Sequence, residues 1–217
     1  MRKSLYAATL VSFALISLSA CAAKPALKDY SAFRGTNPKS IVVVPVTNKS
    51  IQIDAPDNFL VTLPIPLAER GYYVFPVNMV KRVMEDDGLS DADLVHAADA
   101  RKLAALFAAD AVLLADLVRW DSKYVLISTT TTVTIHYTLK SGKTGETIWD
   151  QELTTAYTPQ AANTGNPLAT LIAAAITAAI ERAAPSYIPL AVQANALAIY
   201  TEGQGIPAGP YDPKYQP

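Results

Sequence analysis

The periodicity of apolar residues changes once along this chain, near Tyr124, and the change limits the sheets that it can form. Before that point a continuous apolar run, Ile41–Val44, and a largely apolar strand segment, Asp110–Val118, alternate with helix-forming segments. Such runs are typical of strands buried on both faces, and strands that alternate with helices pair in parallel. From Tyr124 to Leu139 apolar and polar residues alternate instead, which predicts one long strand with a buried face and a solvent face.

A turn and a return strand follow the alternating segment. Ser141–Gly145 has the composition of a tight turn, and Glu146–Tyr157 is predicted to run back antiparallel. Capping residues and apolar stripes predict helices over 78–85, over 90–109 with Ser90 as its cap, over 166–184 and over 190–200. We therefore predict an α/β fold of the mixed α+β kind, in which a mixed parallel and antiparallel sheet is flanked by helices.

The amino terminus has the pattern of a secretory signal. Arg2 and Lys3 precede an apolar run of about 14 residues, shorter than the roughly 20 that span a bilayer. Small residues then lead to Cys21, and Leu18–Cys21 resembles the bacterial lipobox. That resemblance implies cleavage before Cys21, which then carries acyl chains such as palmitate. Ala22, where an aspartate would favour inner-membrane retention, favours the outer membrane, with the protein facing the periplasm.

The chain divides into four predicted parts. Residues 1–20 are the lipoprotein signal peptide, 21–38 a lipidated tether, 39–200 a single globular domain, and 201–217 a tail rich in proline and glycine that is expected to be disordered. Cys21 is the only cysteine, so an intramolecular disulfide is excluded and an apolar core must stabilise the domain.

Few residues indicate a cofactor or a catalytic centre. The net charge of -1 carries no basic excess, which argues against a nucleic-acid partner. Gly142-Lys143-Thr144 lacks the earlier glycine and the following helix of a phosphate-binding loop, so a hairpin turn is expected. The two histidines, His96 and His136, have no histidine or cysteine nearby in sequence to complete a metal site. We therefore expect no metal, no cofactor and no enzymatic activity.

An enzymatic or ligand-binding alternative stays open at one place. Asn48 and Asp116 follow strand ends, where an open α/β sheet forms its crevice. Convergence of Asp116, Asp121 and His136 in a concave site would favour this alternative.

The segment 168–180 suggests a contact with another protein. One face of its predicted helix is strongly apolar, and the opposite face carries small residues rather than charges. Those small residues are Ala173, Ala174, Thr177 and Ala178. Either the body of the protein covers both faces, or a partner packs closely against the small residues. The tail could also become ordered on such a partner.

Four segments together resemble a family of uncharacterised bacterial lipoproteins. They are Ile41–Asn48 (IVVVPVTN), Pro66–Pro76 (PLAERGYYVFP), Ala109–Leu114 (ADAVLL) and Tyr137–Trp149 (YTLKSGKTGETIW). That family is similar in fold to the amino-terminal domain of the TolB translocation protein and to the periplasmic domain of the curli-secretion lipoprotein. The resemblance implies a TolB-like mixed sheet and no known catalytic residues.

These expectations combine into one function and one alternative. The first is an outer-membrane lipoprotein whose periplasmic domain serves binding or assembly as an accessory part of an envelope secretion or assembly system. Its partners would be the membrane, through the lipid, and an envelope protein or a second copy of the chain. The alternative is a periplasmic enzyme or small-ligand-binding lipoprotein that uses the crevice at Asn48 and Asp116.

Overall fold

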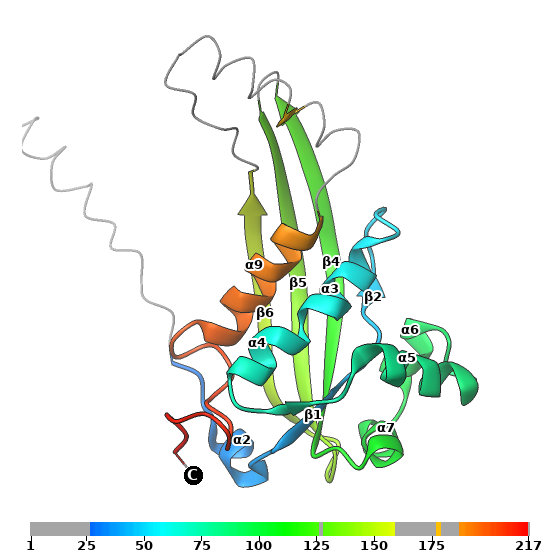
Figure 1. Ribbon diagram of the computed structural model, residues 1–217, viewed down its shortest axis with the longest axis vertical. Coiled ribbons are helices and arrows are strands. Elements are labelled where there is room, and N and C mark those ends of the chain that lie inside the picture. Colours follow the sequence, from blue (N-terminus) through cyan, green and yellow to red (C-terminus); the bar gives the residue numbers. More distant parts are fainter. Residues whose placement is uncertain (1–26, 126–127, 159–176, 179–186, 217) are drawn as a thin grey trace, which may run out of the picture.

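The computed structural model describes residues 27–125, 128–158, 177–178 and 187–216. One six-stranded sheet runs through the molecule, with helices on both faces (Figure 1). Its strands are β1 (Ser40–Val43), β2 (Thr47–Asn48), β3 (Tyr73–Val74), β4 (Ala111–Val125), β5 (Ser128–Ser141) and β6 (Thr147–Tyr157). The order is β3-β1-β4-β5-β6, and β2 also pairs with β4. The parallel and antiparallel pairs confirm the predicted mixed class.

In the parallel half of the sheet, β1 is buried on both faces. β1 pairs in parallel with β3 and β4, and β2 continues along β4 after an interruption at Pro45, which has no N–H to donate to the ladder. Along β1, Ile41 and Val43 join one hydrophobic cluster, whereas Val42 and Val44 join the other. The predicted doubly buried strand is confirmed.

The antiparallel half begins earlier than the sequence indicates. β4 runs on to Val125, and β5 starts at Ser128 and pairs antiparallel with it, so the predicted single strand over 124–139 is wrong at its start. Residues 126–127 are leucine and isoleucine, and no glycine, proline or asparagine marks the reversal. The predicted buried positions from 131 to 139 are confirmed, because every second residue of β5 there is buried.

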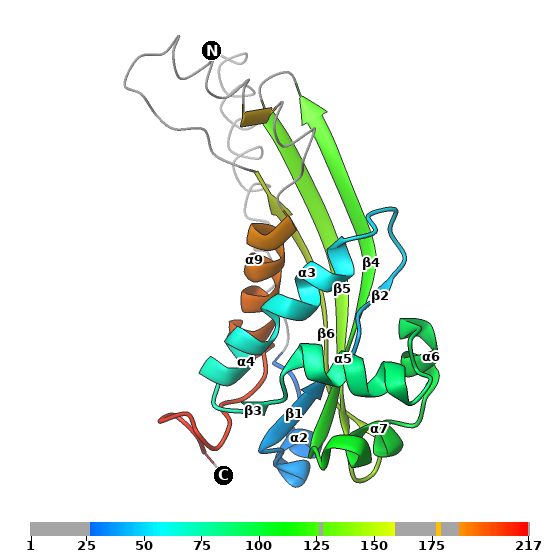
Figure 2. The same cartoon turned by 45° about the vertical axis from the view of Figure 1, so that its right-hand side comes forward.

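Seven described helices cover the two faces of the sheet. On one face lie α2 (Ser31–Thr36), α3 (Ala55–Thr62), α4 (Pro64–Glu69) and α9 (Tyr187–Tyr200), and on the other lie α5 (Val77–Asp86), α6 (Ala92–Ala97) and α7 (Ala100–Phe107) (Figure 2). Beyond the helices, β4 and β5 extend as a two-stranded ribbon (Figure 1). None of the described helices is long and apolar enough to cross a membrane.

The predicted helix over 90–109 is two helices. Ala98 is extended, and the Asp99 carboxylate accepts a hydrogen bond from the Arg101 N–H, which starts α7. Asp91, rather than Ser90, caps α6. The hydrogen bond of the Asp99 carboxylate to the backbone favours this break, because it competes with the hydrogen bonds of a continuous helix. The break leaves α6 beside β2. Of the predicted helix over 166–184, only residues 177–178 are described, and they are helical.

The carboxyl-terminal tail packs on the body, so the expectation of disorder over 201–217 is corrected for residues 201–216. Ile206 is fully buried, and the Trp149 indole donates to the Gln204 carbonyl at 2.9 Å. The backbone N–H of Gly209 donates to Arg70 O at 2.8 Å. Gly209 has no room for a side chain, because a Cβ atom would meet the carbonyl of residue 71. The tail is ordered because the body supplies the core that it lacks.

The predicted tether is also partly folded. The Lys28 N–H donates to Gly203 O at 3.1 Å, and the Tyr30 hydroxyl donates to Gly205 O at 2.7 Å. Phe33 of α2 is buried in the main core. The folded domain therefore begins near residue 28 rather than residue 39.

Candidate functional site

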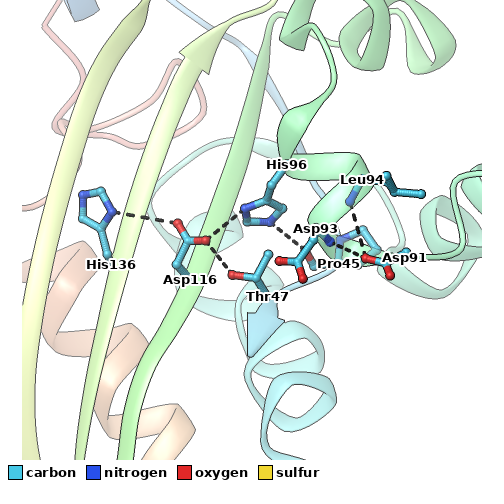
Figure 3. Close-up of polar contacts among 8 residues, drawn as sticks. All are labelled: Pro45, Thr47, Asp91, Asp93, Leu94, His96, Asp116 and His136. Atoms are coloured by element: carbon cyan, nitrogen blue, oxygen red, sulfur yellow. Dashed lines mark hydrogen bonds and ion pairs between the residues drawn. The ribbon is translucent and has the colours of Figure 1, made fainter. Parts of the chain in front are cut away.

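A polar cluster lies on the face of β4 that α5, α6 and α7 cover, at the point where that cover ends. Val112, Leu114 and Asp116 alternate along that face, and the two apolar residues are buried in the cluster under α5 to α7. Asp116 is the next position along. In the register of the sheet, Thr47 of β2 and His136 of β5 are its direct neighbours on either side. His96 reaches the same carboxylate from α6 (Figure 3).

The contacts of the Asp116 carboxylate join four elements. Its Oδ1 atom accepts from the Thr47 hydroxyl at 2.5 Å and lies 3.1 Å from His96 Nδ1. Its Oδ2 atom lies 3.9 Å from His136 Nδ1, and the His96 Nε2 atom lies 2.9 Å from the Pro45 carbonyl (Figure 3). The His96 side chain is 12% exposed, whereas that of His136 is 38% exposed. The cluster thus fastens α6 to the sheet and leaves one imidazole at the surface.

The environment of Asp116 favours its charged form. The hydrogen bond with His96 lowers the pKa of Asp116 to about 2, and the Thr47 hydroxyl and the charge of Lys49 act in the same direction against the effect of burial. Thr47 donates its proton to this carboxylate rather than to a histidine. The ionised carboxylate therefore links α6 and β2 to β4.

The two residues of the predicted crevice do not come together. Asn48 is exposed, and its side chain binds its own loop by donating to Gln52 O at 2.8 Å and accepting from the Ser50 N–H at 2.9 Å. Adjacent residues of a strand point to opposite faces, so Thr47 takes the position beside Asp116 that the sequence suggested for Asn48.

Of the three residues named for a catalytic alternative, two converge. Asp116 and His136 are paired across the sheet, whereas Asp121 forms an ion pair with Arg119. His96 contacts the Pro45 carbonyl and the Asp116 carboxylate, both far from it in sequence. No local motif links it to Asp116, because the break at Ala98 is what directs α6 to β2. Among the described residues, no group of three histidine, cysteine or acidic side chains could hold a metal ion.

The other predicted contact residues are only partly described. Cys21, Ala173 and Ala174 lie outside the described residues. Thr177 and Ala178 are helical and half-buried.

A second candidate site, which the sequence did not reveal, is an apolar groove between α4 and α9. The groove has a volume of about 240 Å³. Its lining comprises Thr62, Ile65, Pro66, Glu69, Val192, Ala196 and Tyr200. Ile65 is 59% exposed and Val192 is 47% exposed. The sequence hides the groove because α9 is apolar on nearly every side, so its pattern does not distinguish the face toward the sheet from the face toward solvent.

Comparison with known proteins shows which proteins the chain resembles. Residues 28–211 match the family described as "Putative lipoprotein GNA1162-like". A protein of Neisseria meningitidis serogroup B, "Putative lipoprotein NMB1124/NMB1162", is 30% identical over 210 residues, which are 94% of this chain and 95% of that protein. The crystal structure of lipoprotein GNA1162 from Neisseria meningitidis is similar with a TM-score of 0.54 and 29% identity, over 69% of this chain and 100% of that one.

Proposed function

Because the chain belongs to the GNA1162-like family of lipoproteins, we propose that it is an outer-membrane lipoprotein that binds an envelope protein from the periplasmic side. In this proposal Cys21 carries the lipid, and the folded domain is an accessory part of an envelope secretion or assembly system. Family membership supports the lipid anchor. The envelope partner and the outer-membrane location go beyond what family membership supports.

The observation that carries the binding role is the apolar surface around the α4–α9 groove. Six large apolar side chains on α3, α4 and α9 are between 39% and 59% exposed. They are Val61, Ile65, Ile188, Val192, Leu197 and Tyr200, and three of them, Ile65, Val192 and Tyr200, line the groove. Apolar patches on a soluble domain mark contact sites, and a groove between two helices fits the apolar face of a helix from another protein.

The polar cluster supports binding over catalysis. Both oxygen atoms of its carboxylate face groups of the same protein. A ligand at this place would have to displace a contact that fastens α6 to the sheet. The cluster is therefore assigned a structural role, and the groove the recognition role.

Crosslinking in whole envelopes tests the binding role. We expect the double variant Ile65→Glu, Val192→Glu to lose the crosslinked partner of the wild-type protein, because two charges would be buried in an apolar contact. Thr154→Glu adds a charge on the exposed face of β6 and is the matched control. The variant Ala174→Glu, Ala178→Glu tests the small-residue surface in the same experiment. An unchanged partner in the groove variant, with normal folding, would overturn the groove assignment.

The lipid anchor has its own test. Cys21→Ser, or globomycin treatment, is expected to leave an unprocessed precursor in the membrane fraction. Normal maturation in both cases would refute lipidation. Fractionation of inner and outer membranes then checks the location.

A further inference from the structure

The first described residues are fixed to one end of the sheet. Lys28 pairs with Asp150, near the start of β6, and its N–H donates to Gly203 O. The Leu27 side chain reaches Gly203 as well, because a Cβ atom on that glycine would collide with it. The Tyr215 hydroxyl donates to Asn37 Oδ1 at 2.7 Å, which ties the tail to the end of α2. We call the surface formed by Leu27, α2 and residues 201–216 the anchor face.

Little chain separates this face from the proposed lipid. Cys21 precedes Leu27 by six residues, and six residues span at most about 22 Å when fully extended. The ribbon points the other way (Figure 2). Asp150 is level with Thr138 of β5, and Thr130 lies eight residues further along that strand, about 27 Å at the rise of a β-strand. The lipid can therefore hold the anchor face near the membrane without bringing the ribbon to it.

Two exposed side chains of the anchor face favour the same orientation. On the anchor face Leu27 is 77% exposed and Tyr211 is 70% exposed. An exposed leucine gains from entering the boundary between headgroups and acyl chains, and tyrosine is enriched at that level.

We infer that the anchor face rests on the lipid surface, with Leu27 and Tyr211 in contact with it, and that the β4–β5 ribbon points away into the periplasm. This inference rests on the proposed lipidation of Cys21. The exposed cations of the face, Arg34 and Lys214, are offset by Asp29 and Glu202. The contact is therefore apolar and depends little on the charge of the lipid.

Energy transfer to a membrane dye tests the orientation. The full-length lipidated protein is reconstituted into phosphatidylcholine vesicles whose headgroups carry an acceptor. A donor is attached at Lys214→Cys on the anchor face or at Thr130→Cys on the ribbon, while the thiol of Cys21 is blocked by its lipid. We expect several-fold stronger transfer from position 214. Adding phosphatidylglycerol to the vesicles should change the ratio little.

Two further variants separate the possible outcomes. Leu27→Glu, Tyr211→Glu should reduce the difference between the two donor positions, whereas Ile51→Glu, on an exposed loop away from the face, should not. Equal transfer from both positions in a protein that floats with the vesicles would overturn the orientation and leave the lipid anchor intact. A protein that fails to float with the vesicles would overturn the anchor itself. Melting curves of each variant verify folding.

Discussion

The two halves of the sheet differ in whether helices cover one face or both. β1 and the first part of β4 are covered by helices on both faces, and their alternate residues fill two separate apolar clusters. β5 and β6 are covered on one face, and their other face carries a ladder of threonines such as the bonded pair Thr134 and Thr154. The first half buries both sets of alternate side chains, whereas the second half buries one set and leaves the other open to solvent. Mutations should therefore have very different costs in the two halves.

The largest effect is expected in the doubly covered half. Leu113 of β4 is fully buried, and Leu113→Ala should lower the free energy of unfolding by about 3 kcal/mol, because it removes apolar contacts and leaves a cavity. Thr134→Ala, on the open face of β5, should cost less than about 0.5 kcal/mol. Chemical denaturation of the two variants measures both values. Equal losses would remove the distinction between the halves.

The tail provides the next test, because it adds core to the half that is covered on one face. Ile206→Ala should destabilise the protein by about 2 kcal/mol, since the side chain is fully buried in the main cluster. Tyr211→Ala, at a position that is 70% exposed, is the control and should change stability little. Thermal unfolding compares the two. Equal unfolding temperatures for the two variants would show that the tail adds nothing to the core.

A buried polar network in the same cluster gives a somewhat smaller effect. The Tyr137 hydroxyl donates to Asn195 Oδ1 at 2.6 Å, and Asn195 Nδ2 donates to Thr62 Oγ1 at 2.8 Å. Asn195→Ala should cost about 1.5 kcal/mol, because it leaves the buried Tyr137 hydroxyl without its acceptor, whereas Thr62 keeps its hydrogen bond to the Asn58 carbonyl. The double variant with Tyr137→Phe should recover part of the loss. Additive losses would show that the hydrogen bond contributes nothing.

The polar cluster at Asp116 predicts a pH-dependent effect. The folded-state pKa of Asp116, about 2, lies below its ordinary value of 3.8, so the ionised carboxylate stabilises the fold at neutral pH, and this contribution is lost as the pH falls from about 4 toward 2. Asp116→Asn should therefore lower the free energy of unfolding at pH 7. The pKa difference sets an upper limit of about 2 kcal/mol on this loss, and solvent screening reduces it because the side chain is 25% exposed.

The control for this effect is Asp121→Asn, at a half-exposed pair with Arg119, which should cost less than about 0.5 kcal/mol. Urea denaturation between pH 2 and pH 7 measures both variants. A deficit of Asp116→Asn that stays constant down to pH 2 would contradict the assignment.

The sequence by itself determined the class of the fold. Continuous apolar runs mark strands covered on both faces, and alternation marks strands covered on one, because a strand presents successive side chains to opposite faces. The same local rule placed the buried residues of β5 correctly. The motif ending at Cys21 and the four family-like segments pointed to a lipoprotein family, which the match over residues 28–211 shows.

Only the tertiary structure decided the features that depend on residues far apart in the chain. The register between β2 and β4 brings Thr47 rather than Asn48 to Asp116, and no local pattern specifies a register between strands 69 residues apart. The chain leaves α6 at Ala98, and Asp99 caps α7. This break places α6, and with it His96, beside β2. The tail, too poor in apolar residues to fold alone, became ordered because Ile206 and its backbone found partners on the body. Local composition reports what a segment can bury by itself, whereas packing depends on what its neighbours offer.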